Sequence, residues 1–173
     1  MKQFTVSKLA ASIIVAASCM PFTAAHAKET AVEFVGKAAA ATKFEIDTSK
    51  LALQRSSNPE VKSFAQTMID EHTAAADEMK AAMARDKVDE ALLTVALDAK
   101  HAKMLEKLRE AKAENFDEAY MDVQEAAHKE AIDIFEDFAG KGDTDALKIF
   151  AAETLFKLKE HAKHADTLEA KID

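Results

Sequence analysis

Apolar side chains recur at alternating steps of three and four along most of the chain, which is the spacing that places them on one face of an α-helix. The pattern falls into four long segments and one shorter segment. It predicts helices over residues 30–55, 59–85, 90–112 and 116–139, and a last helix from residue 144 almost to the C-terminus. No run shows the strict alternation of a half-buried strand, so the sequence predicts an all-α protein.

The breaks between these segments carry recognisable helix-end signals. Asn58 followed by Pro59 is typical of a helix start, and Gly140 and Gly142 are placed to end the fourth segment. Asp143 is then in position to cap the last helix. No linker rich in Pro or Ser separates the segments, so we expect one domain. Its predicted architecture is an up-down four-helix bundle with a short helix inserted between the second and third long helices.

Composition and charge narrow the function classes. The chain has only 3 Gly and 2 Pro, as expected for a mostly helical protein. It carries 31 Asp and Glu against 23 Lys and Arg, a net charge of −8. Binding to nucleic acid depends on clustered basic residues, so a nucleic-acid partner is not expected. The sequence does not predict a protein partner or an oligomeric state.

The N-terminal residues resemble an export signal. Lys2 and Lys8 precede an apolar run over 9–20, which small residues follow up to Ala27. The run is too short to cross a bilayer. We therefore expect a cleavable signal peptide over 1–27, a mature domain over 28–173, and a periplasmic location. The alternative, a lipoprotein acylated at Cys19, is less favoured because Ala16 replaces the large aliphatic residue usual three positions upstream.

Each long helix also places a polar residue on its apolar stripe, and these residues suggest a buried site. They are Glu45, His72, Glu125, His128 and His161. A buried carboxylate or imidazolium is costly unless it is paired or bound to a metal. Two interpretations stay open: a transition-metal site inside the bundle, or pairs of Glu and His that hydrogen-bond without an ion and fix the register of the helices.

Heights along the bundle allow a smaller version of this site. At about 1.5 Å per residue, His161 lies nearer the level of Glu125 than that of His128. His128 could then stand aside and hydrogen-bond Thr154 on the facing helix.

Mixed carboxylate and imidazole ligands suit iron, manganese, zinc or copper. Met68, one turn from His72, is a soft ligand that keeps copper among the candidates, whereas no Cys-x-x-Cys-His motif is present for covalent haem. His101 is expected to help the inserted helix cover the bundle, and His164 to lie at the edge of the core or in solvent rather than to bind a metal. No catalytic Ser/His/Asp arrangement or phosphate-binding glycine loop is present, so the sequence predicts a binding protein more readily than an enzyme.

Several of these segments resemble the DUF4142 family of secreted bacterial proteins. The matching stretches are Val61–His72, Phe116–Tyr120, His128–Ile132 and Phe150–Leu155, together with His161. The resemblance implies a ferritin-like bundle exported across the inner membrane, in a family without an established biochemical function. It carries Glu45, His72, His128 and His161 onto this chain as the residues of the family pattern.

The chain also departs from related patterns. Glu71 and Ala127 stand before two of the histidines, where the family often has Asp. Leu158 and Ile69 occupy the positions where a di-iron protein would need a second Glu-x-x-His motif, which argues against ferroxidase activity. Two functions remain as expectations: a periplasmic metal-binding bundle for storage, buffering or redox protection, or a non-enzymatic, stress-associated interaction module of the cell envelope with a metal-free Glu/His network.

Overall fold

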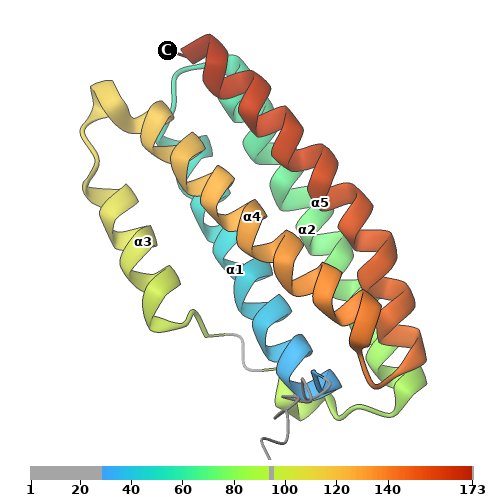
Figure 1. The fold of residues 1–173 in the computed structure, drawn as a ribbon. Helices are drawn as coiled ribbons and strands as arrows, with labels where there is room; N and C mark the ends of the chain where they lie inside the picture. The colour runs from blue at the N-terminus through green and yellow to red at the C-terminus, as the bar shows by residue number, and fades with distance from the viewer. Residues whose placement is uncertain (1–28, 94–95, 173) are drawn as a thin grey trace, which may run out of the picture.

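The structure is a computed structural model that describes residues 29–93 and 96–172, so the expected signal peptide and Cys19 lie outside the described residues. Four long helices form the body of the molecule (Figure 1). They are α1 (Ala31–Arg55), α2 (Pro59–Asp86), α4 (Phe116–Lys141) and α5 (Asp145–Ile172). The short helix α3 (Ala99–Glu110) and two 3-10 turns, η1 (Glu90–Leu92) and η2 (Ala113–Asn115), complete the described elements.

The helices pack as two hairpins, α1 with α2 and α4 with α5. Helix α1 also contacts α4, and α2 contacts α5, so the four helices enclose one core. Helix α3 lies outside this square against α1 and α4 (Figure 1). The expected four-helix bundle with an inserted helix is therefore confirmed. No helix in the described ranges is long and apolar enough to span a membrane.

The inserted helix is shorter than the sequence pattern predicts. Residues 90–92 form only the 3-10 turn η1, and α3 begins at Ala99 rather than at residue 90. The Asp98 carboxylate explains this start, because it accepts a hydrogen bond from the backbone N–H of His101 at 2.9 Å and so caps the first turn. At the other end, α3 stops at Glu110, two residues before the expected end.

Two aspartates cap helices other than the ones nearest to them in the sequence. Asp143, expected to cap the last helix, instead accepts a hydrogen bond from the backbone N–H of Ala31 at the start of α1, at 2.8 Å. The first turn of α5 is capped by Asp86, whose carboxylate accepts from the N–H groups of Ala146 and Leu147 at 3.1 and 2.8 Å. These long-range caps join three helix ends at one end of the bundle.

The end of α4 also differs from expectation, because the helix continues through Gly140 to Lys141. Gly142 then closes it by donating its N–H to the carbonyl of Phe138 at 2.8 Å. A Cβ at Gly142 would lie 2.7 Å from the Phe138 ring, so this close approach requires glycine.

The core consists of two large apolar clusters separated along the bundle axis. One contains Phe34, Met83, Phe138 and Leu147 among others, and the second contains Phe64, Met68, Tyr120 and Leu168. On every long helix, the residues between these clusters include one buried Glu or His. The fold therefore holds a polar layer near the middle of its apolar core.

Candidate metal centre

Three histidines from three helices meet in this polar layer. His72 on α2, His128 on α4 and His161 on α5 each offer one ring nitrogen, and these nitrogens lie within 4.8 Å of one another. The ring centroids are 5.6 to 5.9 Å apart. The three residues are 6%, 0% and 8% exposed, so the cluster lies inside the bundle.

The fourth long helix supplies a carboxylate to the same layer. Glu45 on α1 is 0% exposed, and its Oε2 lies 3.6 Å from Nε2 of His72 and 3.5 Å from Nδ1 of His128. These distances are within the range of an ion pair but are long for hydrogen bonds. Each of the four helices thus contributes one potential ligand.

Two of the rings are oriented by partners on their outer side. Nδ1 of His128 lies 2.9 Å from the carbonyl oxygen of Gln124, to which its N–H can donate. Nε2 of His161 lies 2.9 Å from Oε2 of Glu71, a half-exposed carboxylate on α2. Such partners fix the tautomer of a metal-binding histidine and leave the other ring nitrogen with a free lone pair.

The inward-facing polar atoms of this layer have no hydrogen-bond partner among the described residues. They are both carboxylate oxygens of Glu45, Nε2 of His72, Nε2 of His128, Nδ1 of His161 and Oγ1 of Thr154. Buried polar atoms are nearly always paired, and each unpaired one costs about 1–3 kcal/mol. A cation between the histidines would bind one nitrogen of each imidazole, and the Glu45 carboxylate lies beside them as a further possible ligand.

Burial controls the charge of these groups. It raises the pKa of the Glu45 carboxyl well above its usual range and lowers the pKa of His72 well below its usual range, with a further lowering from the two neighbouring histidines. Burial also lowers the pKa of His128 to about 4. His72 and His128 are therefore neutral at physiological pH, which is the form that binds a metal.

A second polar layer joins α1 to α4 beside the cluster. Gln124 donates from its side-chain Nε2 to Oγ1 of Thr48 at 3.1 Å, and Ser49 hydrogen-bonds the hydroxyl of Tyr120 at 2.9 Å. All four residues are 0% exposed. These bonds fix the register of the helices that carry Glu45 and His128.

The structure corrects the predicted position of Glu125. This residue is exposed, and the buried residue on its turn of α4 is Gln124. The inward stripe of α4 steps from Met121 by three to Gln124 and then by four to His128, the reverse of the order assumed from the sequence. Glu125 is therefore not part of the cluster, and the Glu-x-x-His motif contributes only His128.

The smaller site, without His128, is also wrong. The ring centroids of His128 and His161 are 5.6 Å apart, equal to the separation of His72 and His161. Oγ1 of Thr154 forms no hydrogen bond to His128 or to any other described residue.

Sequence reasoning did not assign a role to Glu71 or Gln124. The signal for Glu71 is its position beside His72, at the edge of the inward stripe of α2. Gln124 lies one turn before His128, the position from which a backbone carbonyl can reach an imidazole on the same helix.

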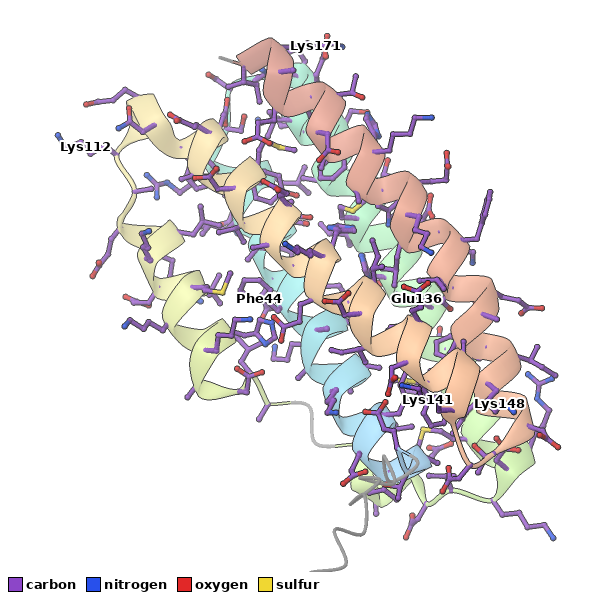
Figure 2. The ribbon with its side chains drawn as sticks, viewed as in Figure 1. Phe44, Lys112, Glu136, Lys141, Lys148 and Lys171 are labelled. Carbon is purple, nitrogen blue, oxygen red and sulfur yellow. The ribbon has the colours of Figure 1, made fainter. Side chains whose placement is uncertain are left out.

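The remaining histidines of the described chain lie outside the cluster. His101 is 3% exposed, and its ring centre lies 4.6 Å from that of Phe44 at a tilt of 38°. Its Nδ1 bonds Oδ2 of Asp98 at 2.6 Å. Figure 2 shows Phe44 in the space between α3 and the bundle, so His101 helps α3 cover this side, as the sequence indicates. His164 is exposed, with its ring 5.2 Å from that of Phe64.

Fold and site together define an all-α four-helix bundle with a buried cluster of three imidazoles and one carboxylate. The family model for DUF4142, described as a domain of unknown function, matches residues 17–168, and the chain belongs to this family. A solved structure entitled "CopM in the Cu(II)-bound form" is similar to this chain with a TM-score of 0.71 and 18% identity. The likeness covers 84% of this chain and 99% of that one, and it shows a shared fold. No match was found among the curated proteins.

Proposed function

We propose that this protein is an exported metal-binding bundle that holds one transition-metal ion between His72, His128 and His161, with Glu45 as a fourth ligand. The observation that carries the proposal is the convergence of histidine ring nitrogens from three helices in one buried layer, with the unpaired Glu45 carboxylate of the fourth helix beside them. Metal–nitrogen bonds of about 2.0–2.1 Å require nitrogens roughly 3.3–3.6 Å apart. Ring nitrogens within 4.8 Å reach that spacing through small side-chain movements.

The metal-free alternative, a network of Glu–His hydrogen bonds, has less support. Glu45 lies 3.5 to 3.6 Å from the two nearest histidine nitrogens, and the His128 nitrogen concerned is already bonded to the Gln124 carbonyl. A network that stabilised the fold would satisfy its own members. Here the Glu45 carboxylate and one ring nitrogen of each histidine have no hydrogen-bond partner among the described residues.

Copper is the ion that we favour, with zinc as its main competitor. Three imidazoles and one carboxylate suit both, and copper binds such donors more tightly than other divalent first-row ions do. The similar fold found in a Cu(II)-bound protein supports this choice. Iron and manganese are less favoured because only one carboxylate lies in the cluster. The biological role that fits is storage, buffering or redox protection in the periplasm, reached through the signal peptide proposed for residues 1–27.

Metal content tests this proposal. Protein is purified from the periplasm without a tag and dialysed against Cu(II) or Zn(II). Elemental mass spectrometry should then find about one equivalent of metal per chain. A variant carrying both His72→Ala and His128→Ala should retain none. The matched control is His164→Ala, which changes an exposed histidine of α5. Wild-type protein that retains only a small fraction of an equivalent would instead favour the interaction module.

A further inference from the structure

The layer next to the histidines is built from small side chains. Ala41, Ala75 and Ala131 lie one turn away from Glu45, His72 and His128 on their respective helices, all toward the same end of the bundle. With Thr154, Phe135 and Leu158 they line a cavity of about 10 Å³ that Glu45 and His72 also border. A cavity of roughly 10–15 Å³ by this measure holds one water-sized molecule.

Three unpaired polar groups border this cavity. They are the Glu45 carboxylate, Nε2 of His72 and the hydroxyl of Thr154, on residues that are 0%, 6% and 4% exposed. The ion held by the histidines would bind His72, beside Glu45. It would not satisfy the Thr154 hydroxyl, which needs a hydrogen-bond partner inside the cavity.

We propose that this cavity binds one small ligand that coordinates the ion and hydrogen-bonds Thr154. The ligand is water or hydroxide, and fluoride can take its place. The inference rests on the proposed function and deepens it. A site that keeps one position for an exchangeable ligand can exchange its ion or react, whereas a purely structural site is closed by protein ligands. The cavity volume limits the ligand to about one heavy atom.

A surface groove lies next to the cavity. Thr42 lines both the cavity and a surface groove of about 260 Å³ between α1 and α2. Lys43, Lys50 and Lys80 line that groove together with a single acidic residue, Asp47. Lys43 is paired with Asp47 at 2.8 Å and Lys80 with Asp77 at 3.4 Å. Lys50 therefore supplies the remaining positive charge, which favours a small anion over a cation at the mouth of the groove.

The test uses the full mature chain loaded with one equivalent of Cu(II) and titrated with potassium fluoride. Electron–nuclear double resonance should detect ¹⁹F coupling to the copper in the wild-type protein. Ala131→Val adds two carbons to the cavity wall and should abolish the coupling while copper stays bound. Ala126→Val, at an exposed position of the same helix, is the matched control and should retain it. Thr154→Val should weaken fluoride binding about tenfold, because it removes one hydrogen bond to an anion.

The outcomes separate this inference from the proposed function. Stoichiometric copper without fluoride coupling in the wild-type protein, or coupling unchanged in both Ala131→Val and Thr154→Val, overturns the inference and leaves the metal site standing. Failure to bind copper at all overturns both. If Ala131→Val does not fold, the nearly isosteric Thr154→Val decides the question alone.

Discussion

Glu45 is the side chain whose energetic role depends most on a bound ion. Its carboxylate is fully buried and has no hydrogen-bond partner in the described chain, so without a cation it either keeps a proton or carries an uncompensated charge. Both states cost free energy that a metal would recover. Replacing Glu45 by a neutral residue should therefore raise the stability of the metal-free protein and lower its affinity for metal.

Glu45→Gln should stabilise the metal-free protein by about 1–3 kcal/mol at neutral pH, because an amide carries no charge to desolvate. The same substitution should weaken copper binding at least tenfold, because it removes an anionic ligand. Urea denaturation with chelator and calorimetric titration measure the two effects. Glu125→Gln, at an exposed position, should change neither. A less stable metal-free Glu45→Gln protein contradicts this account of the carboxylate.

Glu71 acts on the site through His161. Its carboxylate bonds the outer ring nitrogen of that histidine at 2.9 Å. Loss of such an orienting partner costs about 10–100-fold in metal affinity. Glu71→Ala should therefore raise the Kd for copper within that range. Glu78→Ala, on the same helix and paired with Lys157 at the surface, should leave the Kd unchanged. Equal Kd values for the two variants rule out an orienting role for Glu71.

At this scale the sequence predicted most, but not all, of the cluster. Glu45 and the three histidines could be found because each is a polar residue on an apolar stripe. Gln124 and Glu125 are adjacent, and steps of three and four fit either of them, so periodicity alone did not determine which faces inward. Only packing against α1, where Gln124 meets Thr48, resolves that choice.

Among the elements, α3 depends most on contacts outside itself. It has 12 residues, which is marginal for an isolated helix. Arg55 at the end of α1 caps its C-terminus by donating to the carbonyls of Leu108, Arg109 and Ala111 at 3.2, 2.7 and 2.6 Å. The Arg55 guanidinium also lies 4.6 Å from the centre of the Phe116 ring. The sequence could not predict this cap, because its partners are more than 50 residues apart.

Arg55→Ala should destabilise the protein by about 2–3 kcal/mol, since it removes several charge-assisted bonds and a cation–π contact. Hydrogen exchange should increase mainly in α3, and copper stoichiometry should not change because α3 carries no ligand. Arg85→Ala removes an exposed arginine that hydrogen-bonds the Ala81 carbonyl of its own helix, so we expect almost no effect. Faster exchange spread evenly over all helices argues against a local capping role.

For the molecule as a whole, the sequence predicted the helices and their order more fully than the hydrogen bonds that join their ends. Apolar periodicity determined the number, order and approximate lengths of the long helices, because each must bury one stripe. It could not show that Asp86 and Asp143 cap helices distant from them in sequence, since those bonds form only after the helices have packed. It also could not place the ring nitrogens, whose positions depend on side-chain partners.

The buried histidines give the metal-free molecule a distinctive pH dependence. His128 has a pKa of about 4 in the folded state against an ordinary value of 6.5, so the unfolded chain takes up the proton first as pH falls. His128 therefore contributes about 3 kcal/mol to the free energy of unfolding above pH 6.5, and this contribution is lost as the pH falls toward 4. The lowered pKa of His72 acts in the same direction. The raised pKa of Glu45 acts in the opposite direction, since the folded state keeps a proton that the unfolded chain releases above pH 4.5.

As the pH falls from 7 to 5, the two histidines lower the stability of the folded state and the Glu45 carboxyl raises it. Because two groups act against one, we expect a net loss of stability. Urea midpoints measured with chelator should fall over that interval. They should fall less in His128→Gln, whose side chain does not titrate. An equal fall in both proteins would assign the acid sensitivity to other groups.

Anomalous diffraction from crystals of the copper-loaded protein would locate the ion in the bundle. We expect one strong peak inside the bundle, about 2 Å from Nε2 of His72, Nε2 of His128 and Nδ1 of His161. A peak confined to surface residues, or no ordered copper at all, would contradict the proposed metal site.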